Sequence, residues 1–176
     1  MYEVIDNFLP SDQADLVETI FLSNKIYWRY SDTVASINDN EYFYFQSTLK
    51  NTRGNSTICH IDCLSALGYV LQNFSKRNLL ENYYLERARL NLYVKTDKII
   101  HHNFHTDDHV EHIIGLYYPN TNNGYTRLKI NNDIIKIDSV KNRMVIIDGS
   151  IEHASSTCTD KKVRVSLNLN FFPYFV

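Results

Sequence analysis

Two histidines and an aspartate have the residue types and spacing of a metal site. His105 and Asp107 are two residues apart, in a stretch that is typical of a strand. Because residues i and i+2 of a strand point the same way, this pair would present an imidazole and a carboxylate to one point in space. His153 is the only histidine in the last third of the chain, and it follows another expected strand and an Asp-Gly-Ser turn. Two histidines and one carboxylate on one side of an iron ion leave positions open, which suits non-haem Fe(II) oxygen chemistry.

The His-x-Asp pattern is not specific by itself, because the chain contains a second copy. His60 and Asp62 also match it, but they begin a helical pattern in which Asp62 is expected to be the N-cap. Cys59 and Cys63 lie beside this copy, yet no second pair of cysteines or histidines completes a zinc site. The weight of the pair at 105–107 therefore depends on the residues around it.

The last expected strand carries an arginine that needs an anion. From Val163 to Phe172 the strand alternates strictly, with apolar residues on one face and Arg164, Ser166 and two asparagines on the other. If the polar face points into a barrel, the buried guanidinium requires a partner, because an unpaired buried charge is costly. A dicarboxylate fits, since a guanidinium can hold a carboxylate through two parallel hydrogen bonds and Ser166 can add a third. The alternative is that this face is solvated and Arg164 is an ordinary surface residue.

A second expected strand shows the same alternation of apolar and polar residues. In the segment 87–94, four apolar side chains point one way, and Arg87, Arg89, Asn91 and Tyr93 point the other. Asn91 and Tyr93 could donate hydrogen bonds to the remaining oxygens of the same ligand. Either arginine could instead contact a second anion or the substrate, and for Arg87 an outer, solvated position is the simpler interpretation.

The order of these motifs resembles that of the Fe(II)/2-oxoglutarate-dependent oxygenase superfamily. An N-x-Y element, then H-x-D, then a distal histidine, then R-x-S on a final strand span about residues 85–172. The chain looks most like small, single-domain members of the prolyl-hydroxylase-like branch, and its N-x-Y element is also similar to the nucleic-acid demethylase branch. The segment between the H-x-D motif and the distal histidine is short and contains no long substrate-covering insert.

The resemblance implies a double-stranded β-helix and a dioxygenase that uses Fe(II), 2-oxoglutarate and O2 to hydroxylate a substrate. It implies that His105, Asp107 and His153 hold the iron. By the same resemblance Arg164 holds the distal carboxylate of 2-oxoglutarate, with Ser166 or Tyr93 assisting; the spacing from His153 to Arg164 also suits the family.

The elements that must position these residues form two groups. Residues 1–82 contain two helix candidates, one starting at Pro10–Asp12 and one running from about Asp62 to Leu79, and strand candidates at Tyr42–Leu49 and Tyr27–Tyr30. After residue 83, short strands separated by Asn- and Gly-containing turns are expected. They are Leu85–Lys95, Ile99–His105, His112–Tyr118, Tyr125–Ile130, Ile134–Asp138, Arg143–Ile147 and Val163–Phe172. This pattern predicts an α+β fold: one domain over 1–176, in which the helices of 1–82 pack on one sheet of a jelly-roll core formed by 83–176.

Composition excludes several classes of partner. The net charge of −2, from 18 basic and 20 acidic residues, offers no general attraction to nucleic acid, and no apolar stretch is long enough to span a bilayer. The first residues lack the features of a signal peptide. Three cysteines are unlike a secreted disulfide framework, so a reducing cytoplasm is expected.

Other interpretations remain open from the sequence. A cupin-like jelly-roll metal protein without 2-oxoglutarate turnover could use three of His101, His105, His109 and His112, and a scaffold protein would need no metal. His101, His109 or His112 could also orient an iron ligand. The substrate is expected to be a peptidyl proline, another side chain or a small molecule. One further hypothesis is a substrate groove lined by Trp28, Tyr117, Tyr118 and Tyr125.

Overall fold

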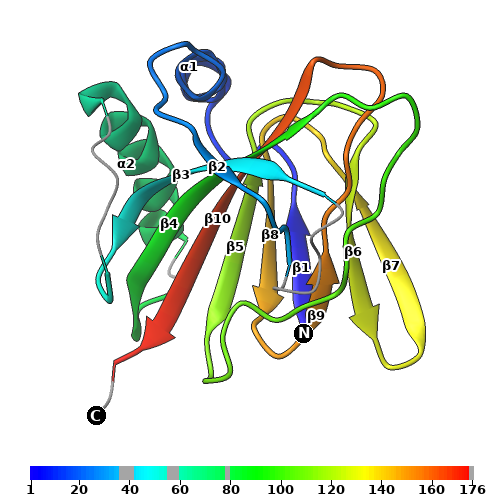
Figure 1. Cartoon of the computed structure of the whole chain (residues 1–176). Helices are drawn as coiled ribbons and strands as arrows, with labels where there is room; N and C mark the ends of the chain where they lie inside the picture. Colours follow the sequence, from blue (N-terminus) through cyan, green and yellow to red (C-terminus); the bar gives the residue numbers. More distant parts are fainter. Residues whose placement is uncertain (36–41, 55–59, 78–79, 175–176) are drawn as a thin grey trace.

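The chain folds into two antiparallel sheets and two helices (Figure 1). The structure, a computed structural model, describes residues 1–35, 42–54, 60–77 and 80–174. The helices are α1 (Ser11–Phe21) and α2 (Ile61–Lys76). The strands are β1 (Tyr2–Ile5), β2 (Arg29–Ser31), β3 (Tyr44–Asn51), β4 (Tyr83–Val94), β5 (Ile113–Tyr118), β6 (Tyr125–Ile130), β7 (Asp133–Asp138), β8 (Arg143–Asp148), β9 (Glu152–Ala154) and β10 (Val163–Pro173).

After residue 83 the chain passes back and forth between the two sheets, and only the successive strands β6 and β7 stay in the same one. The larger sheet has the order β1-β8-β5-β10-β4-β3-β2, and the smaller has the order β7-β6-β9. The segment between β4 and β5 lies beside the smaller sheet, with antiparallel bridges from His101 to Ser156 and from His105 to His153. From β4 to β10 the chain thus winds as a double-stranded β-helix, which confirms the predicted α+β jelly-roll fold.

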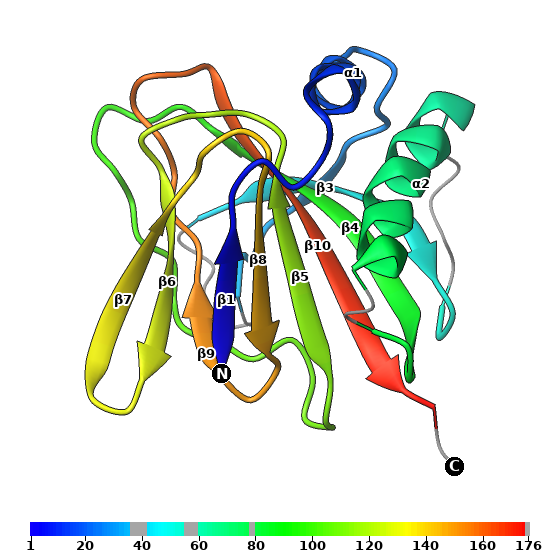
Figure 2. The same ribbon diagram turned by 180° about the vertical axis from the view of Figure 1, so that it is seen from behind.

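Both helices pack on one face of the larger sheet, as predicted. Figures 1 and 2 show α1 and α2 beside this sheet and the strands β6, β7 and β9 at the opposite end of the molecule. Buried residues of both helices, among them Val17, Phe21, Val70 and Phe74, form one core with Leu167 and other apolar side chains of β4 and β10. The helices therefore cover the apolar face of β4 and β10.

The space between the two sheets has an apolar half and a polar half. Aliphatic and aromatic side chains of β5, β6, β7 and β8 fill the first half, including Ile114, Tyr118, Leu128, Ile137 and Ile147. The other half lies between β4 and β10 on one side and β9 and residues 101–105 on the other. Polar side chains line it, and it contains the candidate site.

Three elements differ from the sequence predictions. Ile99–His105 is not a continuous strand, because its backbone pairs with the neighbouring segment only at intervals, through His102 N–H to Ser155 O (3.0 Å) and the reciprocal bonds of His105 and His153. The strand β1 was not predicted; it is short and pairs with the edge of β8. The strand β9, which carries His153, was not predicted either, and it is only three residues long.

The second helix also begins differently from the prediction. His60, not Asp62, is the N-cap, and its Nδ1 accepts a hydrogen bond from the Asp62 backbone N–H (3.3 Å). Asp62 lies in the first turn, where its negative charge suits the helix dipole, and it pairs with Lys25 at 2.8 Å. Leu64 is exposed rather than part of the buried stripe, and Leu79, the predicted end, lies outside the described residues. Among the described helices, none is long and apolar enough to cross a membrane.

Candidate active site

The polar faces of β4 and β10 lie side by side and form one wall of the site. The two strands pair antiparallel, so each polar residue of β10 lies opposite a polar residue of β4. The pairs are Arg164–Tyr93, Ser166–Asn91, Asn168–Arg89 and Asn170–Arg87. Arg164 is only 1% exposed, which excludes the solvated-face alternative. The alternation in the sequence thus places the predicted ligand-binding residues on one surface.

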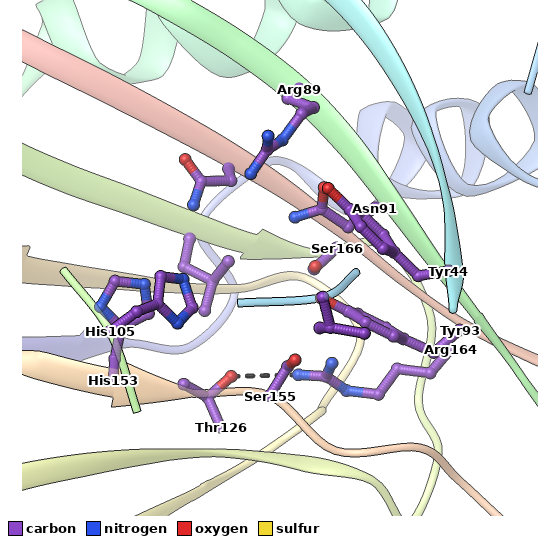
Figure 3. A pocket seen from close by; sticks show the side chains of 13 residues that line it. Tyr44, Arg89, Asn91, Tyr93, His105, Thr126, His153, Ser155, Arg164 and Ser166 are labelled. Atoms are coloured by element: carbon purple, nitrogen blue, oxygen red, sulfur yellow. Dashed lines mark hydrogen bonds between the residues drawn. The ribbon is translucent and has the colours of Figure 1, made fainter. Parts of the chain in front are cut away.

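His105, Asp107 and His153, here called the metal triad, come together at the edge of this wall. The antiparallel bridge between His105 and His153 of β9 brings the two imidazole rings to a centroid distance of 4.6 Å. One ligand atom from each of the three side chains lies within 4.8 Å of the others. Figure 3 shows the two rings next to each other at one end of the pocket. A single cation can therefore be reached by all three groups.

The histidines of the triad present the same ring nitrogen to this point. The Nδ1 atoms of His105 and His153 face the backbone carbonyls of Asn103 (3.4 Å) and Ile151 (3.3 Å). A proton held on Nδ1 by a carbonyl leaves the Nε2 lone pair free for a metal. Burial, together with the neighbouring His153, lowers the pKa of His105. This keeps the His105 ring neutral at physiological pH, as metal binding requires.

Asp107 is a buried carboxylate held by three side chains. Its Oδ2 accepts hydrogen bonds from Asn168 Nδ2 (2.9 Å) and Asn170 Nδ2 (2.8 Å), and its Oδ1 lies 3.3 Å from Arg87 Nη2. Burial alone would raise the pKa of Asp107, but the neighbouring His153, the charges of Arg87 and Arg89 and the Asn170 hydrogen bond lower it far below the usual value. The group is therefore ionised and fixed. Arg87 is not the outer, solvated residue that the sequence favoured.

Arg164 lies at the other end of the polar space. Its Nε donates to Ser139 Oγ (2.8 Å), and its Nη2 and Nη1 donate to Thr126 Oγ1 (3.0 Å) and Ser156 O (3.3 Å). Gly124 lies directly against it, because a Cβ at that position would be 2.6 Å from Arg164 Cδ. No carboxylate forms an ion pair with Arg164 anywhere in the described ranges. A buried guanidinium is thus held by neutral acceptors alone.

One pocket joins the histidines of the triad to Arg164. The side chains that line it include those of four residues singled out in the sequence, Tyr93, Asn91, Ser166 and Arg89, as Figure 3 shows. Burial raises the pKa of Tyr93, so its phenol stays protonated as a donor. Sequence reasoning missed Tyr44, Thr126 and Ser155, which also line the pocket. This volume, called the inter-sheet pocket below, is where a ligand could contact a metal and Arg164 together.

Solved structures share this architecture over nearly the whole chain. A prolyl hydroxylase of Trichoplax adhaerens, in complex with a hypoxia-inducible-factor peptide fragment, matches with a TM-score of 0.69 over 98% of this chain and 83% of its own, at 16% identity. A 2OG-Fe(II) oxygenase family oxidoreductase of Burkholderia pseudomallei matches with a TM-score of 0.70 over 97% and 84%, at 10% identity. A Pseudomonas putida prolyl-4-hydroxylase matches with 0.64 over 98% and 92%, at 14% identity. The fold is that of the 2-oxoglutarate/Fe(II)-dependent oxygenases.

The likeness to known proteins is found by comparison of structures and not by comparison of whole sequences. No protein-family model matches the chain, and no curated protein matches it either. At identities of 10–16% the neighbours establish the fold, while the activity must be argued from the site.

The three other histidines that the sequence offered as metal ligands, or as residues that orient a ligand, do not join the triad. His101 contacts the Tyr125 hydroxyl at 2.6 Å, His109 is exposed, and His112 stacks on Phe172 beside Gly149. Within the described part of the chain, the metal triad is the one group of three such ligands that could share an ion. The three-histidine alternative is therefore wrong for these residues.

Two further hypotheses receive no support. Tyr117 and Tyr118 are fully buried and Trp28 packs against the helix-side core, so these residues do not line a common groove with Tyr125. The pair Cys59 and Cys63, for which the sequence offered no second pair to complete a zinc site, cannot be followed, because Cys59 lies outside the described residues. Cys63 belongs to α2 and is buried in the helix-side core.

Proposed function

We propose that the protein is an Fe(II)- and 2-oxoglutarate-dependent dioxygenase that hydroxylates its substrate. The observation that carries this proposal is the inter-sheet pocket, which links a metal-ligating triad to a buried guanidinium without a carboxylate partner among the described residues. The two halves of the site suit two different partners. The imidazoles and the carboxylate of the triad suit a metal ion, and Arg164 suits an anion, so one anionic ligand of the metal could contact both.

The triad fits a divalent iron ion by the chemistry of its donors. His105 and His153 would bind through Nε2, and Asp107 would bind through its carboxylate, which Asn168, Asn170 and Arg87 hold in place. Three protein ligands leave positions for a chelating co-substrate and O2. Bound there, iron would supply the coupling of O2 reduction to the oxidative decarboxylation of 2-oxoglutarate.

The pocket residues around Arg164 would bind the end of 2-oxoglutarate that lies away from the metal. Arg164 would hold the distal carboxylate, with Ser166 and the protonated Tyr93 hydroxyl as further donors and Asn91 beside them. Tyr93 is held in place because its ring stacks on those of Tyr44 and His102, with centroid distances of 5.7 Å and 5.1 Å. The protein would thus orient the co-substrate from the closed end of the pocket toward the metal.

The substrate is proposed to be a peptide side chain or a small molecule. Four of the similar structures are named as prolyl hydroxylases, and one of these carries a peptide. In the overall reaction one oxygen atom of O2 enters the substrate C–H bond and the other enters succinate, with release of CO2. The nearly neutral charge of the chain argues against nucleic acid, and a cytoplasmic location stays a prediction.

The test compares the wild type with matched histidine variants. Purified protein is incubated in air with Fe(II) and 2-oxoglutarate, together with free amino acids or proline-containing peptides, and succinate is measured. We expect iron-dependent succinate formation that His153→Ala abolishes and His101→Ala retains, because only His153 belongs to the triad. Tight iron binding without any binding of 2-oxoglutarate would instead support the cupin-like alternative.

A further inference from the structure

A second arginine of the inter-sheet pocket lies at the level of the metal triad. Arg89 lies on β4 directly opposite Asn168 on β10, the residue that donates to Asp107. Arg164 is four residues away along β10, or about 13 Å at the usual strand rise. Arg89 also lines the pocket together with His105. Its guanidinium therefore belongs to the metal end of the pocket rather than to the proposed carboxylate site at Arg164.

Arg89 forms no ion pair with a carboxylate of the described residues. Its Nη1 donates to the neutral Gln46 side chain at 3.3 Å, and its buried Nε has no hydrogen-bond partner. Arg87 lies two residues earlier on the same face of β4, and its Nη2 is by contrast 3.3 Å from Asp107 Oδ1. A divalent metal, Asp107, Arg87, Arg164 and a dicarboxylate co-substrate would together already carry about one positive charge, to which Arg89 adds another. The positive charge of Arg89 then remains for another anion.

A hydrogen-bond acceptor lies beside this cation. Asn168 is 5% exposed, and its amide orientation is fixed because its Nδ2 donates to the Asp107 carboxylate. Its Oδ1 must then point away from Asp107, and that atom is buried without a partner. A buried acceptor without a donor is costly unless a ligand or water supplies one. Arg89 and Asn168 together thus offer a cation and an acceptor on adjacent strands.

The two ends of the pocket differ in their access to solvent. Arg164 is 1% exposed, whereas Arg89 is partly exposed, as is Arg87, whose side chain is 25% exposed. A second molecule that arrives after the co-substrate would therefore meet Arg89 first. We propose that the substrate is a free α-amino acid, whose carboxylate binds Arg89 and whose amino N–H donates to Asn168 Oδ1. This inference rests on the proposed function, because it assigns the substrate of the same site.

The experiment measures binding and needs no turnover. Protein loaded with Fe(II) and 2-oxoglutarate without oxygen is titrated by calorimetry with each standard L-amino acid and with the corresponding α-amide. We expect at least one amino acid to bind, and its amide to bind about tenfold or more weakly, because a charge-assisted hydrogen bond to the guanidinium is lost. Arg89→Gln should weaken that amino acid by about the same factor and leave the affinity for 2-oxoglutarate unchanged.

Two further variants serve as controls. Arg89→Lys keeps the charge without the planar pair of donors and should retain part of the affinity. Arg29→Gln removes one exposed arginine of β2 that does not line the pocket, and it should bind like the wild type. Thermal unfolding of each variant shows whether it is folded.

The outcomes separate the inference from the proposed function. If the wild type with Fe(II) fails to bind 2-oxoglutarate, the proposed function fails and this inference fails with it. If 2-oxoglutarate binds but no amino acid does, or acid and amide bind equally, only the inference is overturned. A loss of 2-oxoglutarate affinity in folded Arg89→Gln would also overturn it, because Arg89 would then serve the co-substrate.

Discussion

The two ends of the inter-sheet pocket hold their arginines in different ways. At the closed end Arg164 is fully buried, donates three hydrogen bonds to neutral acceptors and lies against a glycine. At the open end Arg89 has one hydrogen bond of 3.3 Å, a buried Nε without a partner and partial exposure. A fully ordered guanidinium suits a ligand that is always the same, since little entropy is lost on binding. A less constrained guanidinium, such as that of Arg89, suits the substrate, which is the ligand that differs from one such enzyme to the next.

The largest expected effect is on co-substrate affinity at the closed end. Arg164→Leu should lower the affinity for 2-oxoglutarate by about a hundredfold, since truncating a buried charged partner commonly costs 2–5 kcal/mol. Iron binding should be retained, because Arg164 does not contact the triad. Isothermal calorimetry of both ligands measures this, and Arg164→Lys is the conservative control. Equal loss of 2-oxoglutarate affinity in Arg89→Gln would remove the distinction between the two ends.

The next effect concerns the asparagine that positions Asp107 at the open end. Asn170→Ala removes the 2.8 Å hydrogen bond to Oδ2 and one of the groups that keep the carboxylate ionised. Loss of such a partner typically lowers metal affinity by about 10–100-fold. Competition with a chromogenic chelator measures the affinity for Fe(II) or Co(II). Unchanged metal affinity in a folded variant would contradict a positioning role for Asn170.

A smaller effect is expected when the closed end is crowded. In Gly124→Ala the new Cβ would lie 2.6 Å from Arg164 Cδ and 2.6 Å from the Thr157 carbonyl oxygen. Overpacking of this kind costs about 1–3 kcal/mol, and the shift of Arg164 should also weaken 2-oxoglutarate binding.

Gly68 offers a matched control for this substitution. It lies on α2 with nothing within 4 Å of an added Cβ. Gly68→Ala should therefore stabilise the protein by up to about 1 kcal/mol, since alanine favours a helix. Denaturant unfolding of both variants measures the difference. Equal stability of the two would show that Arg164 is not packed against residue 124.

The smallest expected effect is on the pH dependence of the unfolding free energy, to which His102, the residue stacked on Tyr93, contributes. Burial, with Arg164 and Arg127 nearby, lowers the pKa of His102 to about 3. Below its ordinary pKa of 6.5 the unfolded chain therefore binds a proton that the folded protein does not, so stability falls as the pH falls. Between pH 6.5 and 4.5 we expect the apoprotein to lose about 1 kcal/mol per pH unit, since a full unit is worth about 1.4 kcal/mol.

A variant isolates the contribution of His102. His102→Phe keeps a ring against Tyr93 but cannot titrate, so the unfolding free energy should depend less steeply on pH. Some slope should remain, because burial also lowers the pKa values of His105 and His101. The pKa of Asp107 is also lowered, so this carboxyl adds to the loss of stability on acidification, but only at a pH near or below its ordinary carboxyl range. An unchanged slope would contradict a neutral, buried His102.

The polar wall could be predicted from the sequence because it depends only on the period of a strand. Alternation alone assigned Arg164 and Ser166 to one face of β10 and Asn91 and Tyr93 to the matching face of β4. The hydrogen bonds from Asn168 and Asn170 to Asp107 could not be predicted, since the partners are about sixty residues apart and meet only in the folded chain.

Other errors have local causes. The segment 99–105 has the composition of a strand, but it bonds to its neighbour only at intervals. Asp62 is a common N-cap residue, yet the preceding His60 caps the helix with its own Nδ1. Thr126, Ser155 and Tyr44 line the pocket without any sequence pattern, because their roles come from tertiary packing alone.

The most direct test of the central claim is an anaerobic absorption titration. The Fe(II)-loaded protein is titrated with 2-oxoglutarate, and the visible spectrum is recorded for the wild type, Asp107→Ala and Arg164→Leu. If the triad and Arg164 bind one metal and one co-substrate in the same pocket, the wild type develops a weak charge-transfer band. Asp107→Ala should not develop it, and Arg164→Leu should need much more 2-oxoglutarate. A folded wild type that binds iron and never develops the band would contradict the claim.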